Sequence, residues 1–156
     1  MNQQGFTLIE LIITLIIMSL LAVSAYIAWP TAINLPAEAF HIVSDIRYTE
    51  TLSMTKNQRY RFVKISTTTY QILNSSGTPV TFPSGSTTMT LNSGITFGTF
   101  TNLPNNLIAF DGKGTPYIDT GSPGTALATT ATIPLTASGQ TKTISISPET
   151  GRLSIS

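Results

Sequence analysis

The sequence is poor in the residues that carry most enzyme chemistry. Its 156 residues include no cysteine and one histidine. Without cysteine, disulfides, metal–thiolate centres and thiol nucleophiles are excluded. Charged residues make up 10% of the chain, and the net charge is +1, whereas typical soluble domains are about one-quarter charged. A net charge so close to zero provides no strong field for attracting nucleic acid.

No catalytic set can be assembled from the residues that remain. The single histidine, His41, lies beside the apolar stripe of a predicted helix, and no acid–nucleophile pair is recognisable around it. No glycine-rich phosphate-binding motif is present. Asp111 and Asp119 flank a glycine-rich stretch, but two acids do not supply the oxygens that calcium requires. We therefore expect no enzyme activity, no metal and no cofactor, and a turn-forming role for both aspartates.

One apolar run near the amino terminus dominates the sequence. The nineteen residues from Leu11 to Trp29 carry no charge. Wound as a helix, they would rise about 28 Å, which matches the hydrocarbon core of a bilayer. One carboxylate, Glu10, stands at the entrance of this run, where a charge is costly unless it has a partner. The run predicts a membrane helix with a functional acid at its start.

Three interpretations of this stretch differ in what they explain. A secretory signal peptide would begin with a basic region, but residues 1–5 contain no Lys or Arg. An ordinary signal anchor explains the length of the run, but neither Glu10 nor Gly5. A processed leader followed by a helix that bundles with copies of itself accounts for all of these features.

Residues 5–11, Gly-Phe-Thr-Leu-Ile-Glu-Leu, resemble the processing motif of type IV pilins and type II secretion pseudopilins. In that family a membrane peptidase cuts after the glycine and methylates the new amino-terminal phenylalanine. The resemblance implies a cut between Gly5 and Phe6, with prepilin peptidase and other pilin or pseudopilin subunits as partners. It also implies a single-pass inner-membrane chain with a periplasmic globular domain, which is later assembled into a pilus or pseudopilus.

The position of Glu10 has a physical rationale in such an assembly. After cleavage, Phe6 would carry an α-ammonium group one helical turn from Glu10, and a carboxylate near a helix amino terminus is favoured by the macrodipole. In an apolar bundle each acid can neutralise the amine of a neighbour, and removing one partner would cost about 3–5 kcal/mol. We predict that Glu10 sets the register of assembly; the alternative is that it reaches the lipid headgroups.

The rest of the chain predicts one α+β domain in which helix precedes sheet. Pro30 and Pro36 each remove a helix hydrogen bond and predict a kink or a restart. From residue 37 to 57, an apolar stripe recurs at spacings of three and four, with Asp45 and Glu50 off it. After Asn57 the period changes to two, with frequent glycine and proline. Strands are expected at 59–65, 70–74, 79–82, 87–92, 95–100, 107–110, 131–136, 141–147 and 152–156, and a surface loop at 111–125.

Several parts of this domain resemble the GspH/FimT group of minor pilins and pseudopilins. They are the helix around 39–57, the segment 110–116 and the ending 144–152. The resemblance implies a long amino-terminal helix, transmembrane in its first half, packed on an antiparallel β-sandwich. It also implies a structural subunit of a type IV pilus or type II secretion pseudopilus. We expect a leader at 1–5, a transmembrane half-helix at 6–29, an amphipathic half-helix at 30–57 and a β-rich part at 58–156.

A cluster of cations suggests an alternative function. Residues 56–64 contain four Lys or Arg and no acid, and alternation places Arg59 and Arg61 on one face of a strand, where they could meet two phosphates. Some FimT-like minor pilins bind DNA through a Gly-Arg-x-Arg motif, of which Arg152 is the one arginine present here. A DNA-binding minor pilin for natural transformation would use Arg59, Arg61, Lys64 and Arg152. We favour the other interpretation, an edge strand whose charges prevent aggregation.

Overall fold

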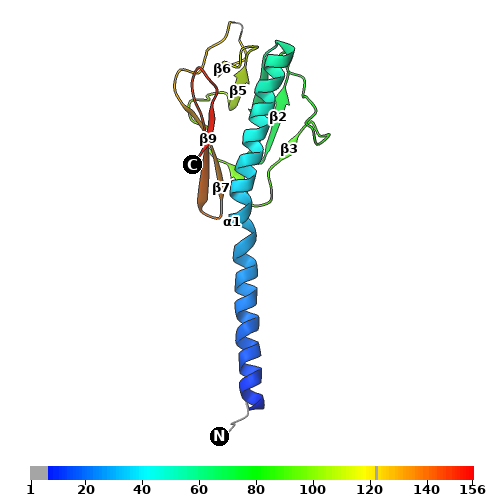
Figure 1. Cartoon of the computed structure of the whole chain (residues 1–156), viewed down its shortest axis with the longest axis vertical. Coiled ribbons are helices and arrows are strands. Elements are labelled where there is room, and N and C mark those ends of the chain that lie inside the picture. Colours follow the sequence, from blue (N-terminus) through cyan, green and yellow to red (C-terminus); the bar gives the residue numbers. More distant parts are fainter. Residues whose placement is uncertain (1–6, 122) are drawn as a thin grey trace.

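A single long helix precedes all of the strands. The computed structural model describes residues 7–121 and 123–156, with the backbone alone for residues 23–33. In this part of the chain, α1 (Leu8–Lys56) is followed by nine strands. Figure 1 shows α1 as a rod whose first half projects from a β-rich head, so that the start of α1 lies far from the sheets. Gly5 and Phe6, between which cleavage is predicted, lie outside the described residues.

Local interactions set the two ends of α1. Thr7 has an extended backbone, and its side chain accepts a hydrogen bond from the backbone N–H of Glu10, as an N-cap residue does. At the other end, Asn57 adopts the left-handed conformation with φ of 49° and donates its N–H to the carbonyl of Ser53. α1 is continuous through Pro30 and Pro36, so the expected restart does not occur. Each proline removes only one backbone hydrogen-bond donor. Leu35 and Ala39, on either side of Pro36, are already buried in the core, and this packing supports the helix there.

The strands form two sheets in which every pairing is antiparallel. The five-stranded sheet has the order β3-β2-β1-β5-β6, and the four-stranded sheet has the order β4-β7-β8-β9. Phe62 of β1 lies opposite Ile72 of β2 and Ile108 of β5. The strands are β1 (Tyr60–Lys64), β2 (Thr69–Leu73), β3 (Met89–Thr90), β4 (Thr96–Phe97), β5 (Leu107–Phe110), β6 (Pro116–Tyr117), β7 (Ala131–Ala137), β8 (Gln140–Ile146) and β9 (Leu153–Ile155).

The second half of α1 supplies one wall of the hydrophobic core. Ala39, Ile42 and Ile46 are fully buried, and α1 contacts strands of both sheets. Their spacing of three and four residues puts them on one face of the helix, as the sequence predicts. Phe62, Tyr70 and Phe97 pack as tilted and edge-to-face rings within the same core. The α+β class and the packing of a long helix on antiparallel sheets are confirmed.

Three local predictions differ from the structure. The strand predicted at 59–65, observed as β1, lies between β2 and β5, so the prediction that it is an edge strand is wrong. Alternation of side chains shows the two faces of a strand but does not show which strands pair with it. The expected loop 111–125 contains β6, whose Pro116 pairs with Phe110. The expected strand 79–82 is reduced to one bridge between Leu73 and Pro79.

Candidate functional site

The first half of α1 lies outside the packed head. From residue 7 to 22 every residue is exposed, and the large apolar side chains range from 46% exposed at Ile12 to 77% at Leu8. A helix with apolar side chains on all sides is stable only against lipid or other helices. Two hydroxyls of this segment are satisfied within the helix, since Thr14 and Ser19 each donate to a backbone carbonyl at 2.8 Å. This surface is therefore suited to an apolar environment.

Within the described part of the chain, no helix is both long enough and apolar enough to cross a membrane. The predicted transmembrane half-helix 6–29 extends into Phe6 and into side chains that lie outside the described residues, so it stays a prediction.

Glu10 lies in the first turn of α1 with its carboxylate exposed. Among the described residues, that carboxylate has no hydrogen bond or ion pair; only the backbone N–H of Glu10 is engaged, by Thr7. A carboxylate in the first turn interacts favourably with the helix dipole. The residue with which Glu10 is predicted to interact, Phe6, lies outside the described residues. Within the described part of the chain, Glu10 thus presents an acid without a partner at the start of an apolar surface.

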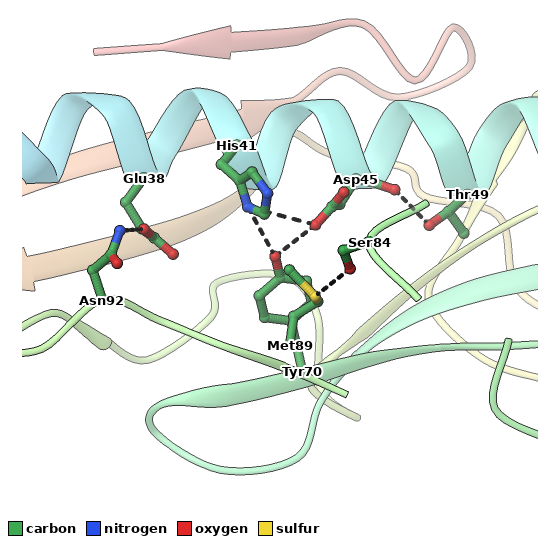
Figure 2. A network of polar contacts seen from close by, with 8 residues as sticks. All are labelled: Glu38, His41, Asp45, Thr49, Tyr70, Ser84, Met89 and Asn92. Atoms are coloured by element: carbon green, nitrogen blue, oxygen red, sulfur yellow. Dashed lines mark hydrogen bonds and ion pairs between the residues drawn. The ribbon is translucent and has the colours of Figure 1, made fainter. Parts of the chain in front are cut away.

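A polar network joins the second half of α1 to the head (Figure 2). The hydroxyl of Tyr70 donates to Oδ2 of Asp45 at 2.6 Å and lies 3.3 Å from Nδ1 of His41. His41 Nδ1 is also 3.7 Å from Asp45 Oδ2. One turn earlier, the side chain of Asn92 donates to Oε2 of Glu38. The network therefore ties three residues of α1 to β2 and to the segment after β3.

Burial controls the ionisation of this network. Asp45 is buried, and desolvation raises the pKa of its carboxyl, although the hydrogen bond from Tyr70 and the nearby His41 act in the opposite direction. Desolvation also raises the pKa of the Tyr70 hydroxyl well above its usual value, which makes it a poor nucleophile. Because Tyr70 donates directly to Asp45, the arrangement is not that of a catalytic triad, in which the acid orients the histidine. The network is structural.

The sequence pattern did not reveal these residues. Asp45 was expected off the apolar stripe, but it is buried, as is Glu38. The two acids are seven residues apart, which is about two helical turns, and this spacing is the one available signal that they share a face. His41 is half exposed beside the stripe, as predicted.

Two of the four predicted DNA contacts are used within the fold. The guanidinium of Arg59 donates to the carbonyls of Gly121 and Pro123 and lies 3.9 Å from the centre of the Tyr117 ring. Nζ of Lys64 donates to the carbonyl of Gly98 at 2.9 Å and faces the ring of Phe100. Both cations therefore contribute to the position of neighbouring loops, through hydrogen bonds to backbone carbonyls.

The other two arginines lie in different sheets. Arg61 belongs to β1 and is half-buried, whereas the exposed Arg152 directly precedes β9. The structure therefore brings Arg59 and Arg61 together but does not join them to Arg152 in one basic track. A polar hollow of about 360 Å³, here named the Arg61 hollow, is lined by Asn57, Gln58, Arg59, Arg61, Ser75, Asp111, Gly112, Thr120 and Gly121.

Asp111 and Asp119 form turns, as predicted. One carboxylate oxygen of Asp111 accepts from the N–H groups of Lys113 and Thr115, at 2.8 and 2.9 Å. Asp119 accepts from the N–H groups of Gly121 and Thr125, and the hydrogen bonding with Thr125 lowers the pKa of its carboxyl. Among the described residues, no group of three or more His, Asp or Glu side chains is placed to hold a metal ion.

Comparison with known proteins points to one superfamily. Residues 1–26 match the model of the prokaryotic N-terminal methylation motif. Two crystal forms of the type IV minor pilin FimU from Pseudomonas aeruginosa have a similar fold, with TM-scores of 0.55 and 0.54 at 15% and 16% identity. Each superposition covers 78% of this chain, and 87% or 92% of FimU. No curated protein sequence matches the chain significantly. The chain thus carries the prokaryotic methylation motif at its amino terminus, and its fold is similar to that of a type IV minor pilin.

Proposed function

We propose that this chain is a minor pilin or pseudopilin. Its amino-terminal methylation motif and the similarity of its fold to that of a type IV minor pilin support this proposal. The chain would thus be a non-enzymatic structural subunit of a type IV pilus or of a type II secretion pseudopilus. The observation that supports this function best is the exposed apolar half of α1, from Leu8 to Leu21, which projects from a compact head. Burying this surface against other helices provides the driving force for assembly.

The proposed maturation begins in the inner membrane. The precursor crosses the membrane once, through the segment 6–29, with its head in the periplasm. Prepilin peptidase removes residues 1–5 by cutting after Gly5 and methylates the amino group of Phe6. The methylation motif over residues 1–26 supports this order of events. The mature subunit then leaves the membrane and enters the filament.

Glu10 is the proposed register device of this assembly. It is the fifth residue of the proposed mature chain and, among the described residues, its carboxylate has no hydrogen bond or ion pair. In a bundle of apolar helices, an unpaired carboxylate is costly, whereas a neighbour's ammonium neutralises it. A subunit is therefore stable only at the axial offset that brings the two charges together.

The test is to recover sheared filaments from cells that express the chain and to determine its amino-terminal residue by mass spectrometry. We expect the chain to be present in the filament fraction, beginning at methylated Phe6. Recovery from membranes alone, with Met1 still attached, would show that the chain is not a processed filament subunit. The alternative, a DNA-binding minor pilin for natural transformation, stays a proposal; Arg59 and Lys64, two of its four predicted contacts, also donate to backbone carbonyls of the head.

A further inference from the structure

The Arg61 hollow lies at the end of the head farthest from the start of α1. Its lining comes from the residues that follow α1, from β1, and from the segments that follow β2, β5 and β6. Figure 1 places the end of α1, with β5 and β6 beside it, at the top of the molecule, opposite the projecting half of the helix. A ligand at this position would therefore meet the distal end of the head.

The walls of the hollow are fixed by hydrogen bonds. The guanidinium of Arg59 donates hydrogen bonds to the carbonyls of Gly121 and Pro123, and the carboxylate of Asp119 accepts hydrogen bonds from the N–H groups of Gly121 and Thr125. On the other side, the turn after β2 is closed by hydrogen bonds from Thr78 N–H to the Asn74 side chain, at 2.9 Å, and from Gly77 N–H to the Asn74 carbonyl, at 3.0 Å. The hollow is thus preorganised, which lowers the cost of binding.

Arg61 is the functional group of this hollow. It is half-buried, and among the described residues its guanidinium has no hydrogen-bond acceptor. Its Nη2 atom packs against Gly77, where a Cβ atom would stand only 3.1 Å away, and φ of +83° favours glycine. Burial lowers the pKa of the guanidinium, yet an arginine stays protonated at any physiological pH. A partly desolvated cation without an acceptor is suited to receive an anion.

The surroundings favour one carboxylate over a polyanion. The charge of Arg59 is already shared with backbone carbonyls, and Asp111 contributes an acid to the lining. The carboxy-terminal end of α1, at Lys56 and Asn57, adds partial negative charge from the helix dipole. A phosphate backbone needs a series of cations, whereas the fork of a single guanidinium matches one carboxylate with two parallel hydrogen bonds.

We propose that the Arg61 hollow binds the carboxylate of an acidic side chain on the protein that packs against the distal end of the head. The identity of that protein as a neighbouring filament subunit rests on the proposed function. The carboxylate site itself is a property of the isolated chain and can be tested without a filament.

The full chain in detergent micelles, labelled with nitrogen-15, would be titrated with a blocked peptide that contains one glutamate, Ala-Ala-Glu-Ala-Ala. The Nε–Hε resonance of Arg61, assigned by its loss in Arg61→Gln, should shift saturably, whereas the glutamine version of the peptide should leave it unmoved. Arg61→Lys keeps the charge without the fork and, followed through the backbone amide of Gly112 in the wall of the hollow, should bind at least several-fold more weakly than the wild type. Arg152→Gln, which removes an exposed arginine directly before β9, should bind as the wild type does.

An unmoved Arg61 resonance with the glutamate peptide would overturn the proposal, as would equal shifts with both peptides. Inorganic phosphate and a 12-base-pair duplex serve as competing probes. If the duplex shifts Arg61 with strong salt dependence and the peptide does not, the site is a nucleic-acid contact and the proposal is wrong. None of these outcomes depends on cleavage at Gly5, so failure here is distinct from failure of the pilin function.

Discussion

The hydroxyl of Tyr70 donates a 2.6 Å hydrogen bond to Oδ2 of Asp45, and this bond connects β2 of the five-stranded sheet to the half of α1 that is packed on the head (Figure 2). Both partners are buried. Breaking the bond would therefore leave a buried polar group without a hydrogen-bond partner, which costs free energy of folding. The bond therefore fixes the rotation of α1 relative to the head, and with it the direction in which the projecting half-helix leaves the sheets.

Tyr70→Phe should destabilise the head. The substitution leaves the buried Asp45 carboxylate without its donor, and we expect a loss of about 1–3 kcal/mol in the free energy of unfolding. Urea unfolding of the full chain in detergent measures it. Tyr48→Phe is the matched control, because the half-buried Tyr48 hydroxyl makes no hydrogen bond with the described residues; its effect should stay within about 0.5 kcal/mol. Equal losses in the two variants would remove the special role of the Asp45 contact.

Stability should depend on pH through Asp45. Burial raises the pKa of this carboxyl above its ordinary value, so the folded state holds the proton more tightly than the unfolded state does. The associated stabilisation is complete below the unfolded pKa and is lost as pH rises through the folded value. Asp45→Asn stays neutral, so its free energy of unfolding relative to the wild type should increase over that interval. A pH-independent difference between the two proteins would contradict this assignment.

Gly5→Leu should block maturation. A bulky side chain at the residue preceding the cut would obstruct the peptidase, and we expect a full-length precursor that retains Met1. Mass spectrometry of the membrane fraction measures the chain length, and Gln4→Ala, one residue earlier, provides the control. A normally shortened Gly5→Leu product would contradict the assignment of the cut to this bond.

Glu10→Gln should separate processing from assembly. The neutral side chain keeps the shape of the first turn but cannot neutralise a neighbour's amine, so we expect normal cleavage and at least a tenfold lower yield in sheared filaments. The tenfold figure corresponds to about 1.4 kcal/mol, well below the cost of stranding one member of a buried pair. Glu149→Gln changes an exposed acid in the head and should assemble normally. Wild-type recovery of Glu10→Gln would exclude Glu10 from the mechanism.

Arg59→Gln should loosen the loop around residues 119–125. The substitution removes hydrogen bonds to two carbonyls and the contact with the Tyr117 ring. We expect the free energy of unfolding to fall by about 1–3 kcal/mol. Hydrogen exchange at the amides of Gly121 and Thr125 should accelerate, while that at Ile133, in the other sheet, should not. Unchanged exchange at all three positions would mean that the loop holds its shape without Arg59.

The sequence determined those features that depend on neighbours along the chain. The motif at residues 5–11, the apolar run and the three-and-four spacing of Ala39, Ile42 and Ile46 are local patterns, and they were enough to predict the long helix and one of its buried faces. Strands β8 and β9 also correspond to two predicted strands, 141–147 and 152–156, and adjacent strands joined by a short turn commonly pair with each other, as these do.

The tertiary structure decided those features that depend on which distant segments meet. Alternation along β1 gave the faces of Arg61 and Phe62 but not the pairing of that strand with β5, more than forty residues away, which makes it central. Asp45 meets Tyr70 from β2, and Arg59 meets the carbonyls of Gly121 and Pro123, which lie more than sixty residues away in the chain. Periodicity reports the side on which a residue lies, whereas its solvation and its partners are set by long-range packing.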